Sequence, residues 1–236
     1  MVDPDRPLVY VGRDESITSS IHKMLAGRYS QLPVMNGGQL AKGVIRWESI
    51  VTRLTQGLDI SGKVHEFMET SPSETDADEP LLDAMDKILR YQYVLVRDRG
   101  KTLGIVTISD LSTAFREMTE PFILLNQIEN HIRMLIIRCK FSPEEIDNAA
   151  TAPKDGRRKG VFALDFGGYQ ALLGNKENWV RLRLNIDRKG FLADLDQVRE
   201  IRNDVMHFDP DRITPKQLNK LQYFAEFLRT LEGRRG

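Results

Sequence analysis

The sequence predicts an α+β protein in two parts, with a repeated α/β module in the first half and an all-helical body in the second. Two observations lead to this fold class. The order of β-rich and amphipathic stretches in residues 1–58 recurs in residues 59–118. After Met118 the strand signals disappear, and apolar residues recur at helical spacing. We therefore expect one domain at 1–118 and a second at 119–236, each large enough to fold as a unit.

The first repeat has the order strand, helix, strand, strand, helix. Its elements are expected at residues 8–11, 17–25, 31–35, 41–45 and 47–54. The first helix is indicated by Ile17, Ile21, Met24 and Leu25, which share one helical face. An Asn36-Gly37-Gly38 turn joins the two central strands.

From its first helix onward, the second repeat has the same order of elements: helix, strand, strand, helix. They are expected at residues 81–89, 93–96 and 102–107, with a further helix from about Ser109. The inward-facing residues of the helix at 81–89 are expected to be Leu82, Met85, Ile88 and Leu89. We interpret the acidic stretch at 70–80 as the connection between the repeats. Matched points such as Gly43 and Gly104 lie about 60 residues apart, which is too far for a solenoid and right for two small modules.

The second half is predicted to be helical throughout. Pro121 is expected to interrupt or start a helix. A Pro- and Gly-containing basic stretch at 151–160 is expected to be a loop. Helices are then expected at about 164–173, from Phe191, and from a capping-box sequence that begins at Thr214. Trp179 and Phe208 are expected in the core.

Composition excludes several classes of protein. The chain has 34 basic and 34 acidic residues and a formal net charge of zero, so no global field indicates a nucleic-acid partner. Its apolar stretches are far shorter than the roughly 20 residues that span a bilayer, and no signal peptide is recognisable, so we expect a cytoplasmic protein that contacts no membrane. Cys139 is the single cysteine and the four histidines are scattered, so we expect no disulfide and no metal site.

One motif in the second repeat suggests a ligand site. Residues 104–110 read GIVTISD and lie where the last strand of the repeat meets the next helix. The first backbone N–H groups of a helix have no intrahelical partner and attract a phosphate. The Thr107 hydroxyl can add a hydrogen bond to that phosphate, and the Asp110 carboxylate can accept hydrogen bonds from ribose hydroxyls. The alternative is that Thr107 and Asp110 form a helix N-cap pair.

With this motif, the two repeats resemble a tandem pair of CBS domains, whose signature is Gly, two apolar residues, Thr or Ser, two variable residues and Asp. The resemblance implies that the pair binds an adenine nucleotide (AMP, ADP or ATP) in the cleft between its modules. It implies a site made by Gly104, Thr107 and Asp110, with Tyr91, Gln92 and Tyr93 contacting the base.

The first repeat departs from this pattern. Gly43-Val44-Ile45 is followed by Arg46, Trp47, Glu48 and Ser49, so the hydroxyl and the carboxylate are both missing. We therefore expect at most one ordinary site per chain. Arg46 is either a solvated side chain or a cation that neutralises a phosphate in the shared cleft.

The helix from Phe191 contains a second candidate site. Asn203 and His207 are one turn apart, with the permanently charged fork of Arg202 beside them. His207 can act as a general acid or base near neutral pH, and Arg202 can stabilise charge on a phosphorane. The string Arg202-Asn203-x-x-x-His207 resembles the motif of HEPN domains, which implies a metal-independent endoribonuclease that acts as a homodimer. The alternative is a non-catalytic domain in which His207 bonds within the bundle.

Other charged residues have weaker interpretations. Four loop residues can contact RNA phosphates, although a solvated basic loop is the commoner explanation: Lys154, Arg157, Arg158 and Lys159. Glu129 and Arg133 are one helical turn apart and are expected to form a salt bridge; Glu129 is also a weak candidate for the catalytic centre.

The sequence thus predicts a homodimeric regulatory protein in which an adenine nucleotide bound to the CBS-like pair controls a HEPN-like ribonuclease. Glu120-Pro121 is the expected point of transmission. The alternative is a non-catalytic ligand-sensing scaffold or dimerisation module. A third hypothesis, a regulator that binds nucleic acid without cutting it, lacks a helix-turn-helix signature.

Overall fold

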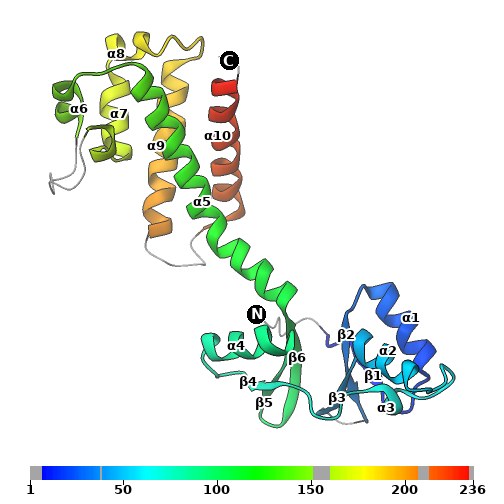
Figure 1. The fold of residues 1–236 in the computed structure, drawn as a ribbon. Helices are drawn as coiled ribbons and strands as arrows, with labels where there is room; N and C mark the ends of the chain where they lie inside the picture. The colour runs from blue at the N-terminus through cyan, green and yellow to red at the C-terminus, as the bar shows by residue number, and fades with distance from the viewer. Residues whose placement is uncertain (1–6, 38, 151–159, 207–212, 234–236) are drawn as a thin grey trace. The chain divides into compact units, whose positions relative to one another are not determined.

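The structure is a computed structural model, and it describes residues 7–37, 39–150, 160–206 and 213–233. The chain forms two compact units, Met1–Phe115 and Arg116–Gly236, called here the N-terminal unit and the helical unit (Figure 1). The sequence pattern placed the boundary at 118.

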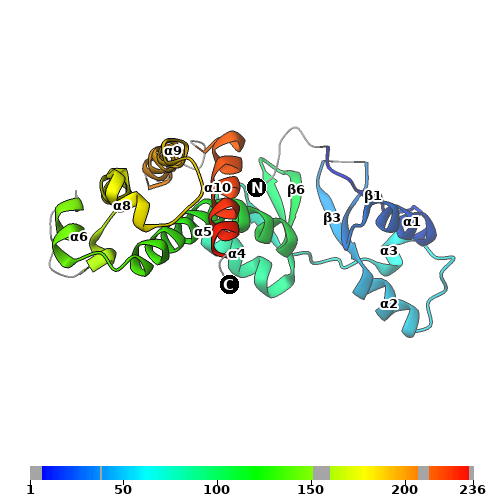
Figure 2. The ribbon, with the colours of Figure 1, turned by 90° about the horizontal axis from the view of Figure 1, so that it is seen from above.

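The first module of the N-terminal unit is a three-stranded sheet with helices. In chain order its elements are β1 (Val11–Gly12), α1 (Ile17–Gly27), β2 (Gln31–Met35), β3 (Ala41–Arg46), α2 (Trp47–Thr55) and α3 (Val64–Phe67). The sheet has the order β1-β2-β3, with β1 parallel and β3 antiparallel to β2. The three helices lie on one side of this sheet (Figures 1 and 2).

The second module repeats this topology. Its elements are β4 (Glu74–Asp76), α4 (Leu81–Tyr91), β5 (Tyr93–Asp98), β6 (Lys101–Thr107) and the start of α5 (Ile108–Arg138). The sheet has the order β4-β5-β6, again with one parallel and one antiparallel pair. The predicted repeat is therefore present in the fold.

Three expectations for these modules were wrong. The first strand does not cover residues 8–11, because only Val11 and Gly12 pair with β2. The connection at 70–80 contains the strand β4, which pairs with β5. Its acidic sequence lacks the apolar pattern from which a strand is predicted. Leu82 and Leu89 are 74% and 61% exposed, because the second sheet covers only the part of α4 around Ile88.

A shared interior joins the two modules into one body. One buried cluster takes residues from both sheets: Met35, Ala41, Val44, Tyr93 and Leu95. Beside it the Ala41 amide donates to Thr102 Oγ1 at 2.9 Å, and the Thr102 amide donates to the Gln39 carbonyl at 2.8 Å. Both polar groups of a buried threonine are thus used to connect the sheets.

The helical unit is built on one apolar core. Its helices are the rest of α5, α6 (Pro143–Ala149), α7 (Phe166–Gly174), α8 (Lys176–Arg181), α9 (Arg188–Met206) and α10 (Pro215–Gly233), with a 3₁₀ turn at Gly160–Ala163. The core includes Ile132 of α5, Tyr169 of α7, Leu195 of α9 and Phe224 of α10, all fully buried. Trp179 lies in this core as expected, whereas Phe208 is outside the described residues.

Pro121 neither interrupts nor starts a helix, which corrects the expectation from the sequence. It lies inside α5 and is buried. A proline inside a helix removes one backbone hydrogen bond and crowds the preceding turn. Here the helix continues on both sides, and its later turns contribute five buried residues to the core: Leu125, Ile128, Ile132, Leu135 and Ile136.

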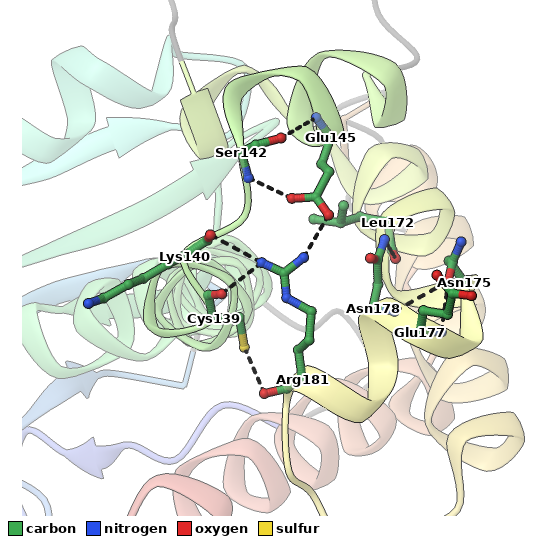
Figure 3. A network of polar contacts seen from close by, with 9 residues as sticks. All are labelled: Cys139, Lys140, Ser142, Glu145, Leu172, Asn175, Glu177, Asn178 and Arg181. Atoms are coloured by element: carbon green, nitrogen blue, oxygen red, sulfur yellow. Dashed lines mark hydrogen bonds and ion pairs between the residues drawn. The ribbon is translucent and has the colours of Figure 1, made fainter.

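Arg181, the last residue of α8, connects this helix to the residues that directly follow α5 (Figure 3). Its guanidinium donates to the carbonyls of Cys139 and Lys140 at 3.0 and 3.1 Å, and to Glu145 Oε1 at 2.6 Å. The same group lies 4.0 Å from the centre of the Phe141 ring. A cation is favourable there, because the last carbonyls of a helix lack intrahelical partners and carry partial negative charge.

We predict that Arg181→Met lowers the free energy of unfolding of the helical unit by about 1 kcal/mol, because two carbonyls and a carboxylate, all open to solvent, lose a charged donor. The measurement is urea unfolding followed by far-UV circular dichroism. Arg229→Met is the matched control, since Arg229 forms an exposed i, i+3 pair with Glu226 and such pairs contribute little. Equal effects of the two substitutions would contradict this role for Arg181.

Candidate functional site

Thr107 and Asp110 lie at the junction of β6 and α5 and bond to each other. The Thr107 amide and hydroxyl donate to Asp110 Oδ2 at 2.9 and 2.6 Å, and the Asp110 amide donates to Thr107 Oγ1 at 3.3 Å. This is the reciprocal N-cap arrangement weighed above as the alternative to a ligand site. These bonds use Oδ2, so Oδ1 of Asp110 has no hydrogen-bond partner among the described residues.

The junction also lines a pocket of about 300 Å³ inside the N-terminal unit. One wall comes from the second module and includes Leu103, Gly104, Ile105, Thr107, Ser109 and Asp110. The facing wall comes from the first module and includes Pro7, Leu8, Val9, Arg28, Tyr29, Ser30, Gln31 and Leu32. The pocket therefore lies between the two modules.

The pocket combines three kinds of surface. Apolar side chains such as Leu8, Val9 and Ile105 line part of it, which suits a planar base. The first turn of α5 adds backbone amides, of which that of Ile108 donates to the Gln92 carbonyl and that of Asp110 to Thr107 Oγ1, and Asp110 supplies a carboxylate. Arg28 brings a cation to the opposite wall from the left-handed C-cap of α1, where its φ is 54°. Phosphate, ribose and base can each find a complementary group here.

Tyr91, Gln92 and Tyr93 are not brought together with Thr107 and Asp110 in this pocket. Tyr91 lines a different pocket of about 510 Å³, together with Ser71 and Arg90. Gln92 and Tyr93 face Arg46 instead.

Their counterparts in the first repeat, Tyr29, Ser30 and Gln31, line the pocket. The repeat offset could have identified them, because the wall that faces each motif comes from the other module.

The first junction is built differently. The Arg46 amide donates to Ser49 Oγ at 3.1 Å, and Ser49 Oγ donates back to the Arg46 carbonyl at 2.9 Å, so Ser49 caps α2. A Cβ atom at Gly43 would lie 2.3 Å from the Glu69 carbonyl oxygen, so this glycine allows the following linker to approach the strand.

The Arg46 side chain is neither solvated nor directed at an empty cleft. It is 14% exposed and donates to Glu69 Oε1 at 3.4 Å and to Gln92 Oε1 at 3.1 Å, while Glu48 Oε2 lies 3.1 Å away. Its guanidinium carbon lies 5.3 Å from the centre of the Tyr93 ring. The two roles considered for Arg46 from the sequence are thus replaced by a set of internal contacts.

Tyr93, whose ring contacts Arg46, is also buried. Its hydroxyl donates to Glu69 Oε2 at 3.3 Å. Burial, followed by the nearby negative charge of Glu69, raises the pKa of the Tyr93 phenol to about 12.

A pocket of about 380 Å³ in the helical unit is lined by two of the three predicted catalytic residues. Arg202 and Asn203 line it together with Asp165, Phe166, Gly167, Gln170 and Arg199. Arg202 Nη1 lies 3.4 Å from Asn203 Oδ1, and Arg199 pairs with Asp196 at 2.8 Å. His207 lies outside the described residues, as do Lys154, Arg157, Arg158 and Lys159.

Glu129 and Arg133 form the expected ion pair, at 2.7 Å, within a partly buried cluster. Arg133 Nε donates to the Tyr169 hydroxyl at 2.8 Å, and this hydroxyl donates to Glu129 Oε1 at 3.2 Å. Burial raises the pKa of the Tyr169 phenol. Glu129 is not among the residues that line the Arg202 pocket, so its contacts here are those of a structural link between α5 and α7.

Two further observations concern only the part of the chain that the structure describes. Within it, no group of three or more His, Cys, Asp or Glu side chains could hold a metal ion. None of its helices is long and apolar enough to cross a membrane.

The N-terminal unit is thus a pair of three-stranded α/β modules with a pocket at one of their strand–helix junctions. The family model of the CBS domain matches residues 2–55 and 64–117, one match for each module. The N-terminal half of the chain is therefore a tandem pair of CBS domains. A comparison with curated proteins found no match.

Solved structures similar to this chain include three from different organisms. An uncharacterized conserved protein from Pyrococcus horikoshii is 26% identical over 46% of this chain and 85% of that chain, with a TM-score of 0.44. A CBS-domain containing protein from Agrobacterium tumefaciens is 20% identical over 46% and 84%, with a TM-score of 0.43. A CBS domain protein from Pyrobaculum aerophilum, complexed with AMP, is 22% identical over 45% and 85%, with a TM-score of 0.41.

The raised pKa of Tyr93 predicts a loss of stability at high pH. Tyrosine in an unfolded chain ionises near pH 10, whereas Tyr93 in the folded protein keeps its proton until about pH 12. Its contribution to stability is thus present below about pH 10 and is lost as the pH rises to about 12. Thermal unfolding between pH 9 and 12 should show a shallower fall in Tm for Tyr93→Phe than for the wild type; parallel curves would refute this.

Proposed function

We propose that the N-terminal unit is an adenine-nucleotide sensor with one site per chain, in the pocket lined by Thr107 and Asp110. The observation that carries this proposal is that the intact motif of the second CBS domain lines a pocket whose facing wall comes from the first. The chemistry of the pocket supports a nucleotide better than a purely apolar ligand, because carboxylate, hydroxyl and cationic groups accompany its apolar surface.

Each part of a nucleotide has a proposed partner. A phosphate binds at the start of α5, to the backbone amides that the Thr107–Asp110 cap leaves free and to the charge of Arg28 on the facing wall; the Thr107 hydroxyl joins these donors only when it turns from Asp110 to the phosphate. Asp110 accepts hydrogen bonds from the ribose hydroxyls, beginning at its unoccupied Oδ1. The apolar side chains of Leu8, Val9 and Ile105 contact the base. AMP, ADP and ATP share these groups, and AMP is the ligand of the Pyrobaculum aerophilum protein.

Asp110→Ala should weaken the binding of AMP, ADP or ATP at least tenfold, because hydrogen bonds to a charged group contribute about 1.5–3 kcal/mol. Isothermal titration calorimetry measures this. Asp98→Ala, which removes an exposed carboxylate at the end of β5, is the matched control. Asp110→Asn keeps an acceptor for the N-cap, so a loss of affinity in this variant separates ligand binding from helix capping. Unchanged affinity in Asp110→Ala would remove the proposed site.

The proposed regulatory target is the helical unit. The helix that begins at the pocket, α5, is continuous from Ile108 to Arg138 and supplies residues to the core of the helical unit. A nucleotide can act on the helical unit only through a difference in its affinity for two conformations of the protein. Glu120 and Pro121 lie within α5 and remain our proposed point of transmission.

The second proposed function, for the helical unit, is that of a HEPN-like metal-independent endoribonuclease acting as a homodimer. One observation favours it: Arg202 and Asn203 line a pocket that also contains the cation of Arg199. Arg202 would stabilise the phosphorane, His207 would transfer protons, and Asn203 would orient His207 or the phosphate. The competing proposal is a non-catalytic scaffold with the same fold, in which these residues only bond within the protein.

The nuclease proposal predicts cleavage of structured RNA by the purified protein in the presence of EDTA. His207→Ala and Arg202→Ala should each lower the cleavage rate at least 100-fold, in line with the contribution of general acid–base and electrostatic catalysis. Arg229→Ala, which removes an exposed arginine of α10, is the matched control. If neither the wild type nor the control cleaves RNA, or if all variants cleave alike, the scaffold proposal replaces the nuclease.

A further inference from the structure

The two CBS domains place different side chains at equivalent positions of their two clefts. Thr107 ends β6 and pairs with Tyr93 of β5, and Arg46 ends β3 and pairs with Gln31 of β2 in the same register. Arg46 is therefore the counterpart of Thr107 in the repeat. Tyr93 is likewise the counterpart of Gln31, which lines the open pocket.

At the first junction, the guanidinium of Arg46 contacts Gln92 and Tyr93, the repeat counterparts of Ser30 and Gln31, which line the open pocket. It belongs to the first module, yet Gln92 and the ring of Tyr93, two of its partners, belong to the second. Glu69, a third partner, comes from the linker that precedes the second module. The contacts of one side chain thus connect both walls of the cleft.

The arrangement requires these partners, because Arg46 is largely removed from water. Its side chain is 14% exposed, and its Nε atom is buried without a hydrogen-bond partner among the described residues. A guanidinium in this position costs desolvation free energy, which a carboxylate and an aromatic face can offset. Its partners are of the kinds that bind a cationic ligand.

We propose that Arg46 is a permanent internal occupant of the first cleft. It holds the two CBS domains together on this side and excludes nucleotide from it, so that binding is confined to the Thr107–Asp110 pocket. The exclusion of nucleotide rests on the proposed sensor function, whereas the connection between the modules does not. The adjacent Trp47 stays within the first module, where its Nε1 donates at 3.1 Å to the carbonyl of Tyr29 in the wall of the open pocket.

A double-mutant cycle tests the connection without any ligand. Arg46→Met, Glu69→Gln and the double variant of the full chain are compared by urea unfolding. We expect the unfolding midpoint of the double variant to fall clearly less than the sum of the two single shifts, because each single substitution leaves the other group without its partner. The control cycle uses Arg229→Met and Glu226→Gln, an exposed pair whose shifts should add. Additive shifts at Arg46 and Glu69 would overturn the connection.

Calorimetry with AMP, ADP and ATP tests the exclusion. Arg46→Thr combined with Ser49→Asp restores the motif in the first domain, and we expect it to raise the stoichiometry from one nucleotide per chain to two. In an Asp110→Ala background, the same pair of substitutions should restore one site. Arg97→Met, which removes another arginine with a buried Nε and a carboxylate partner, Glu74, should leave the stoichiometry at one.

The outcomes separate the two proposals. A folded Arg46→Thr/Ser49→Asp variant that still binds a single nucleotide would overturn the exclusion. A wild-type protein that binds none of the three nucleotides would instead refute the sensor function, and the unfolding cycle would then decide on Arg46 alone.

Discussion

The contact between the two CBS domains is the constraint on which the proposed site depends. The open pocket is not complete within one module, because Gly104, Thr107 and Asp110 of the second module face Arg28 and Tyr29 of the first. The interface is held by a small buried cluster around Val44 and Tyr93, and by the two bonds of Thr102. A pocket of this kind is a property of the pair. Any substitution that loosens the shared interior must also change the distance between the groups that meet a ligand.

Because the two modules are repeats, the residues of their two clefts can be compared position by position. Both junctions are capped by a side chain in the first turn of the following helix, Ser49 in one case and Asp110 in the other. Thr107 is short and stays at its own junction, whereas Arg46 is long enough to reach the other module. At this position, the small neutral side chain of Thr107 leaves one cleft open, and the long charged side chain of Arg46 occupies the other. Proteins built from duplicated modules can lose symmetry in function by a change this small.

Much of the fold, and part of the site, could be predicted from the sequence. Hydrophobic periodicity located β2, the paired strands of both sheets and the helical second half, because burial selects apolar residues at fixed spacing. It failed at β4, because the pairing with β5 involves backbone groups and the residues Glu74, Thr75 and Asp76 have no apolar pattern; the Glu74 carboxylate is paired with Arg97. It failed again for Tyr91 and Gln92, since a motif identifies its own strand and helix but not the wall that another module supplies. The contacts of Arg46 depend on tertiary distances that no local pattern contains.

The hydrogen bonds between Thr107 and Asp110 have a consequence for how such motifs are inherited. An N-cap of this kind contributes about 1 kcal/mol to a helix, and α5 is the helix that runs into the core of the helical unit. Natural selection for a well-ended helix would thus preserve this threonine and aspartate even in a descendant that no longer met any ligand. The GxxTxxD motif can therefore persist in evolution after the protein has lost its ligand. Arg28 and Tyr29, in the facing wall, have no part in this cap, so they would be the first residues to change.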